Sequence, residues 1–95
     1  MVTVGDIYNY IDTFAPFHTA MGFDNVGLLV GGKHCPVTSV MVSMDITPEV
    51  ISEAVSQKAE LIISHHPVIF QPLKRLSPTD VPYLLVQNGL CAIAA

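Results

Sequence analysis

The sequence carries little charge, and most of that charge is acidic. Only 13% of its 95 residues are charged, and eight Asp and Glu residues outnumber four Lys and Arg residues, for a net charge of −4. Proteins that bind nucleic acid through phosphate contacts need a basic surface, so this composition argues against that class. Lys74 and Arg75 form the only basic pair. A solvent-exposed loop explains the pair, with contact to an anionic group as the alternative if it lies near a site.

Long apolar runs are also absent. No stretch of about 18 apolar residues occurs, which excludes a transmembrane helix. The first residues contain Asp6 and Asp12 and have no basic segment, unlike a signal peptide. Even so, 51% of the residues are hydrophobic and the mean hydropathy is +0.51. With so few charges on a chain of this size, we expect further chain or partner subunits to cover part of the apolar surface.

Cysteine is scarce as well. Cys35 and Cys91 are too few for a disulfide framework. Because the sequence shows no secretion signal, we expect a cytoplasmic protein in which both thiols are reduced. Each cysteine is interpreted as a small buried hydrophobic residue. A chain of this length forms one domain at most, so residues 1–95 are treated as a single α/β unit.

The residues that are present alternate between helix and strand signals. Residues 3–14 predict a helix, because Thr3 and Asp6 resemble a capping box and an apolar face follows at helical spacing. A second helix is predicted to begin at Pro48, behind Thr47 as its cap. The predicted apolar faces consist of Ile7, Tyr10, Ile11 and Phe14 in the first helix, and of Val50, Ile51, Ala54 and Val55 in the second.

Strands are predicted at residues 27–32, 40–44, 61–64 and 90–95, with a third helix near residues 81–88. The strand–helix–strand order over about 25 residues calls for parallel strands joined by a crossover. The nearly continuous apolar character of residues 40–44 is expected where both faces of the sheet are covered. The predicted fold class is therefore α/β, with a largely parallel sheet built from β-α-β units and helices on its faces.

The stretch LIISHHPVIF, residues 61–70, places two of the four histidines side by side at the end of a predicted strand. In open parallel sheets, ligands bind beyond the carboxyl ends of the strands. There we expect His65 and His66 on the same edge as Asp45, which ends the preceding strand, on strands that could be neighbours. Neighbouring side chains on a strand point to opposite faces, and Pro67 restricts His66, so the two rings suit two separate ions better than one.

These residues leave several interpretations open. Divalent metal binding is one, because zinc, iron, nickel and manganese all accept imidazole. Acid–base catalysis or phosphate binding by the histidine pair is the second, and packing is the third. Asp45 either faces the site or buttresses it.

Two further groups of residues are weaker candidates. His18 and His34 have no comparable surroundings and are interpreted as structural. Asp24 and Asn25 precede Gly27 in a constrained loop, where turn formation explains them.

The ordered segments FDNVGLLVGG, VMVSMDITPEVISEAV and AELIISHHPVIFQPLKRL resemble the amino-terminal part of the NGG-interacting-factor-like proteins. Many of these proteins are named GTP cyclohydrolase I type 2 homologues. The resemblance covers essentially all 95 residues, and the SHHPVIF block after a DNVGL block is highly specific. The tryptophan that often precedes DNVG is Phe23 here, which we interpret as a tolerated aromatic exchange.

The resemblance implies a centre of two divalent metal ions in an α/β subunit, usually assembled into a toroidal homohexamer. It implies that His65 and His66 are ligands, one for each ion, and that zinc, iron, manganese or nickel occupies the centre. Family members add an aspartate shortly after the strand that ends here at Ala95, and a histidine and a glutamate near their carboxyl end. We therefore expect residues 1–95 to be the amino-terminal part of a longer family domain, with little or no catalytic activity alone.

Three functions follow from this expectation. The leading one is a metal-dependent hydrolase that acts on a nucleotide, in the manner of GTP cyclohydrolase, with Asp45, Asp24 or Asn25 orienting the ligands. The second is a metal-binding regulatory or protein-interaction factor without turnover. In the third, the ions have only a structural role.

Overall fold

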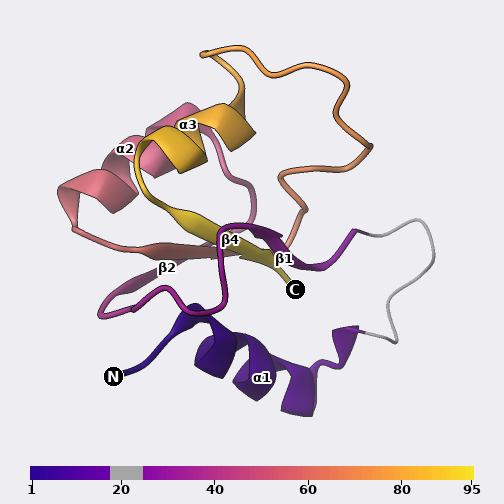
Figure 1. The fold of residues 1–95 in the computed structure, drawn as a ribbon, viewed down its shortest axis with the longest axis vertical. Coiled ribbons are helices and arrows are strands. Elements are labelled where there is room, and N and C mark those ends of the chain that lie inside the picture. The colour runs from indigo at the N-terminus through magenta and orange to yellow at the C-terminus, as the bar shows by residue number, and fades with distance from the viewer. Residues whose placement is uncertain (18–24) are drawn as a thin grey trace.

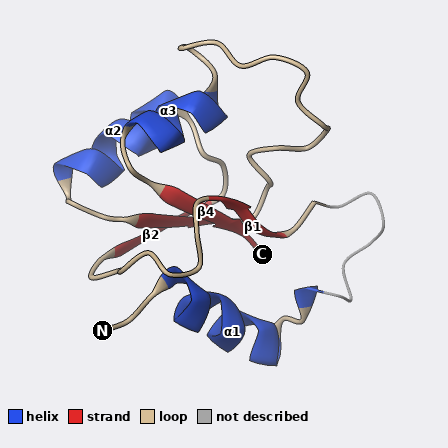
Figure 2. Cartoon of the chain, in the orientation of Figure 1, coloured by secondary structure: helices blue, strands red, loops and turns tan. Residues whose placement is uncertain are grey.

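The computed structural model describes residues 1–17 and 25–95, which form a sheet with helices on both faces (Figure 1). Helix α1 lies against one face of the sheet, and α2 and α3 lie against the other (Figure 2). The elements are, in order, α1 (Val4–Phe14), β1 (Gly27–Val30), β2 (Val40–Ser43), α2 (Pro48–Ser56), β3 (Leu61–Ser64), α3 (Val81–Gln87) and β4 (Cys91–Ala94). Each predicted element is found, and most end one or two residues earlier than expected.

The sheet has the strand order β1-β4-β3-β2. Strands β2, β3 and β4 are parallel, with Leu61 opposite both Val40 and Cys91. Strand β1 is antiparallel to β4, with Gly27 opposite Ala94. The prediction of an α/β fold with a largely parallel sheet is therefore confirmed. This arrangement brings the carboxyl ends of β2, β3 and β4 to one edge.

The first two helices begin where the sequence predicts. The Thr3 hydroxyl accepts a hydrogen bond from the Asp6 amide at 3.2 Å, and the Asp6 carboxylate accepts one from the Thr3 amide at 3.0 Å, which completes the capping box. The Thr47 hydroxyl accepts from the Val50 amide at 3.2 Å, and a proline occupies the first turn of α2. Both caps satisfy amides that have no partner within their helix.

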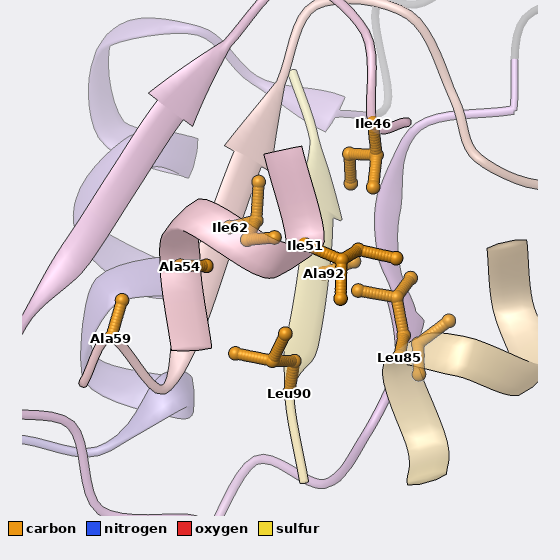
Figure 3. Close-up of a cluster of buried hydrophobic side chains, with 9 residues drawn as sticks. Ile46, Ile51, Ala54, Ala59, Ile62, Leu85, Leu90 and Ala92 are labelled. Atoms are coloured by element: carbon orange, nitrogen blue, oxygen red, sulfur yellow. The ribbon is translucent and has the colours of Figure 1, made fainter. Parts of the chain in front are cut away.

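Two hydrophobic cores lie on opposite faces of the sheet. The core under α2 and α3 centres on Ile62 and Leu85, neither of which has any exposed surface (Figure 3). The core under α1 contains Val4 and Ile11 from the helix, and strand β4 contributes Ile93. Burying one such side chain contributes about 1.5–3 kcal/mol. The cores fix β3 and β4 in the middle of the sheet, where the histidine-bearing strand needs support.

Two expectations about helix faces are wrong in part. Tyr10 and Phe14 of α1 are 70% and 67% exposed. The helix packs through Ile7 and Ile11, as predicted, together with Val4, which was not in the predicted face. The two exposed rings meet edge-on, with centroids 5.4 Å apart. In α2, Val55 is 46% exposed, whereas Ile51 and Ala54 are buried and Val50 is partly buried, as predicted.

The expectation that both faces of residues 40–44 are covered is also wrong. Val42 is 75% exposed and Met44 is 61% exposed. Strand β2 is at the edge of the sheet, and the core under α1 takes residues from β1, β3 and β4 but none from β2. Met41, on the opposite face, does pack against the core under α2 and α3. One face of β2 is therefore apolar and open.

Candidate metal centre

The two adjacent histidines continue the backbone pairing of β3 beyond the end of the strand. The His65 amide donates to the Ser43 carbonyl at 3.2 Å, and the His66 amide donates to the Met44 carbonyl at 2.9 Å. On the other side, the Ala95 amide donates to the Ser64 carbonyl at 2.9 Å. Hydrogen bonds of the histidine amides on the β2 side, and of Ser64 on the β4 side, thus hold the histidines at the carboxyl edge, where they were predicted.

Ser64 shapes the turn into the histidine pair. Its side chain is almost completely buried, at 1% exposure, and its hydroxyl donates to the His66 carbonyl at 2.7 Å. Sequence reasoning missed this residue. The sequence pattern that could have indicated Ser64 is a single polar residue at the end of an apolar strand, immediately before the histidines.

Asp45 contacts one of the two imidazoles directly. Its Oδ1 lies 2.7 Å from Nδ1 of His66, and both side chains are more than half exposed. A carboxylate only accepts hydrogen bonds, so Nδ1 carries a proton, and in the neutral form of the ring the lone pair is on Nε2. This is how a carboxylate typically orients a metal-binding histidine. As a surface ion pair alone, it would contribute at most about 1 kcal/mol.

His65 lines two hollows at the carboxyl ends of the strands. Its ring centroid lies 5.1 Å from that of His66, and the rings are tilted by 52°, so they are not stacked. Both histidines line a hollow of about 350 Å³ whose other walls include Pro67 and Phe70. His65 also lines a hollow of about 370 Å³ next to the open face of β2, with Val42 among its walls. Both imidazoles are therefore accessible beside largely apolar surfaces.

Asn25 fixes the loop that follows the histidines. Its side-chain amide donates to the Ile69 carbonyl at 2.6 Å and so ties the segment before β1 to the loop after β3. Asn25 thus acts on the backbone and makes no hydrogen bond to a histidine ring among the described residues. Asp24, His18 and Phe23 lie outside the described residues.

The remaining candidates lie elsewhere. The His34 ring packs beside Gly32, which follows β1. Lys74 and Arg75 line a hollow of about 230 Å³ with their sequence neighbours, to which neither histidine contributes. The hollow beside Lys74 and Arg75 is therefore separate from the two hollows that the histidines line.

His65, His66 and Asp45 are the candidate metal donors at this edge. Within residues 1–17 and 25–95, no three His, Cys, Asp or Glu side chains are grouped so that they could hold one ion. The two imidazoles fit divalent ions that accept nitrogen, and Asp45 already orients His66. With one imidazole for each ion, most coordination positions would need donors from other residues.

A comparison with protein-family models gives one match. The model described as Duf34/NIF3 (NGG1p interacting factor 3) matches residues 2–95, nearly the whole chain. The chain belongs to the Duf34/NIF3 family. The resemblance seen in the sequence is thereby confirmed.

Curated relatives of this Duf34/NIF3 chain are considerably longer. A protein of Staphylococcus aureus named GTP cyclohydrolase 1 type 2 homolog is 42% identical over 94 residues, which cover 96% of this chain and 26% of the relative. A protein of the same name from Clostridium perfringens is 46% identical over 68 residues, or 72% of this chain and 26% of the relative. The chain thus spans about a quarter of the length of the curated relatives it matches.

Solved structures of relatives also match nearly the whole of this chain and are longer than it. A Staphylococcus aureus hypothetical protein superposes with a TM-score of 0.92 at 36% identity and covers 98% of this chain, which spans 32% of that one. A Bacillus cereus protein related to NIF3 gives 0.91 at 33% identity, with coverage of 98% and 27%. The α/β fold of this Duf34/NIF3 chain is therefore the fold of its relatives over the matching segment.

Proposed function

We propose that His65 and His66 are ligands of a dinuclear divalent-metal centre, one for each ion. The observation that carries the proposal is the 2.7 Å contact between Asp45 and Nδ1 of His66, which leaves Nε2 free to bind an ion. Support also comes from the position of both rings at the carboxyl edge of three parallel strands. Zinc, iron, manganese and nickel all suit imidazole together with carboxylate donors from elsewhere in a longer chain.

We further propose that the complete protein is a metal-dependent hydrolase. Two divalent ions would supply Lewis acidity and activate water near neutral pH. The residues of this chain would bind and orient: Asp45 holds the proton on Nδ1 of His66, and Ser64 and Asn25 fix the backbone on either side of the turn. Phe70 and Pro67 would limit water at one wall of the hollow.

The name shared by the curated relatives suggests a nucleotide substrate for the complete protein, with GTP as the first compound to test. We also propose a homo-oligomer, a toroidal hexamer by resemblance, and a cytoplasmic location. Among the described helices, none combines the length and apolar character needed to cross a bilayer.

Metal binding is best tested by calorimetry on two lengths of chain. A chain extended to the length of its relatives should bind two divalent ions, and His65→Ala and His66→Ala should each remove one. The 95-residue chain should bind weakly, because it lacks the further donors. His34→Ala is the matched control and should leave binding unchanged. Tight binding of two ions to the 95-residue chain, or unchanged binding in both edge variants, would contradict the proposal.

The open apolar face of β2 favours a second function, a metal-binding interaction or regulatory factor without turnover. Val42 and Met44 are exposed there, beside the hollow that His65 lines. Turnover of nucleotides by the extended chain distinguishes the two functions. If wild type binds both ions but turns over no nucleotide, or if wild type and His65→Ala turn over nucleotides equally, the hydrolase proposal fails and the interaction factor is supported.

A further inference from the structure

The two cysteines lie together near the amino-terminal ends of the parallel strands, and the histidines lie at the opposite, carboxyl ends. Cys91 is the first residue of β4 and is 5% exposed, and Cys35 lies partly buried in the segment after β1. Both belong to the core under α1. Both also line one hollow of about 190 Å³, together with Val30, Gly31, Val86, Gly89 and Leu90. Residues 56 positions apart in the sequence thus bring their thiols to the same hollow.

The turn between Gly31 and Cys35 curls over the buried thiol. Gly31 has a φ of +101°, and a Cβ placed on it would lie 2.3 Å from Sγ of Cys91. The Cys35 amide donates to the Gly32 carbonyl at 3.2 Å and closes the turn. A residue with a side chain at position 31 would displace the thiol, so the turn is built around it.

The environments of the two thiols differ. Burial, followed by a hydrogen bond to Cys35 and the Coulombic effect of Cys35, raises the pKa of Cys91, against a smaller opposing effect of the Gly32 amide. Cys91 is therefore a protonated, shielded thiol at neutral pH. Cys35 is the more accessible of the two and is the thiol that an outside reagent would meet first.

We propose that Cys35 and Cys91 form a dithiol site that reacts with low-molecular-weight disulfides of the glutathione class and closes into an intramolecular disulfide. The thiolate of Cys35 attacks one sulfur of the reagent, whose S–S bond breaks and releases one thiolate that takes up a proton. Cys91 then loses its proton to solvent and attacks the Cys35 sulfur, which expels the second reagent thiol. The protein pair loses two electrons, and the reagent disulfide is reduced to two thiols.

The proposal is independent of the metal centre and is tested on the folded wild-type chain. Incubation with oxidised glutathione, followed by alkylation and intact-mass measurement, should show the loss of two hydrogen atoms and no remaining alkylatable thiol. Cys91→Ala should stop at a stable glutathione adduct on Cys35. Cys35→Ala should remain unmodified while folded.

The outcomes that oppose the proposal are distinct. Wild type that keeps both thiols free, or that accumulates the adduct without closing, would show that the two sulfurs do not react together. Closure seen only after unfolding in urea would overturn the proposal for the folded state. Far-UV circular dichroism checks that each variant is folded. If Cys91→Ala unfolds, Cys91→Ser replaces it, and the same adduct is expected.

Discussion

Replacing Gly31 by alanine should destabilise the chain more than the same replacement at Gly27. The two glycines have nearly the same backbone strain for a residue with a side chain, with φ values of +101° and +110°. Their surroundings differ. A Cβ at position 31 would lie 2.3 Å from Sγ, 2.9 Å from Cβ and 3.2 Å from Cα of Cys91, whereas at position 27 the nearest atom is in the Tyr8 ring, 3.7 Å away.

The magnitudes follow from these distances. A non-glycine residue at such a φ costs about 1–3 kcal/mol, and this cost applies to both variants. Overpacking adds about 1–3 kcal/mol for Gly31→Ala alone, because the Cα of Cys91 belongs to a central strand and cannot move aside. We therefore expect free energies of unfolding lower by about 2–6 kcal/mol for Gly31→Ala and by about 1–3 kcal/mol for Gly27→Ala.

Urea unfolding followed by far-UV circular dichroism measures both variants, with wild type alongside. Equal losses of stability in the two variants, within about 0.5 kcal/mol, would contradict the clash between a side chain at position 31 and Cys91. A double variant, Gly31→Ala with Cys91→Ala, provides a further check. It should recover part of the loss, since the contact at 2.3 Å disappears and the one at 2.9 Å remains.

Three other perturbations have expected outcomes. Asp45→Asn should weaken divalent-metal binding to the extended chain by about 10–100-fold by calorimetry, because the carboxylate that orients His66 is lost. Leu85→Ala should lower the free energy of unfolding by about 2–5 kcal/mol, because Leu85 is fully buried. Glu60 has a pKa below its ordinary 4.5, held there by hydrogen bonds from the backbone amides of Thr38 and Ser39, just before β2. It should therefore stabilise the fold above pH 4.5, and this contribution should vanish as the pH falls through the lowered pKa. Acid titration of Glu60→Gln should show a flatter loss of stability.

Each of these has its own contrary result. Unchanged metal affinity in Asp45→Asn would mean that the contact of Asp45 with His66 does not strengthen metal binding. Val86→Ala, next to Leu85 but at a site that is 69% exposed, is the matched control and should be nearly neutral. Equal losses of unfolding free energy in Leu85→Ala and Val86→Ala would contradict the assignment of Leu85 to the core. If the stability of wild type and Glu60→Gln falls in parallel with decreasing pH, Glu60 does not contribute to the pH dependence of stability.

Local signals in the sequence predicted much of the fold. Thr3 and Thr47 cap their helices through hydrogen bonds to nearby residues, so a short window of sequence contains the whole interaction. The parallel pairing of β2, β3 and β4 followed from the lengths of the crossovers. The position of β1 did not follow, because pairing of Gly27 with Ala94 depends on contacts between distant parts of the chain.

The candidate site was predictable to a similar extent. Strand direction placed Asp45 and His66 at one edge, and the structure adds that they touch. The role of Asn25 could not be predicted, since its partner is a backbone carbonyl 44 residues away that no side-chain pattern reveals. The contact between Cys35 and Cys91 was missed for the same reason. Each cysteine was interpreted as a buried hydrophobic residue, and nothing in the sequence indicates that the two are neighbours.

The antiparallel strand β1 also has a consequence for the order of folding during synthesis. Strand β1 ends at Val30, but its partner β4 begins only at Cys91. At synthesis rates of about 5–20 residues per second, the ribosome needs roughly 3–12 s to make the intervening 60 or so residues. For that time β1 lacks the partner that it has in the folded sheet, while β2 can pair with β3 as soon as both are made. The nascent chain therefore exposes an apolar strand for seconds, and this interval is when a chaperone that binds extended apolar segments would protect it.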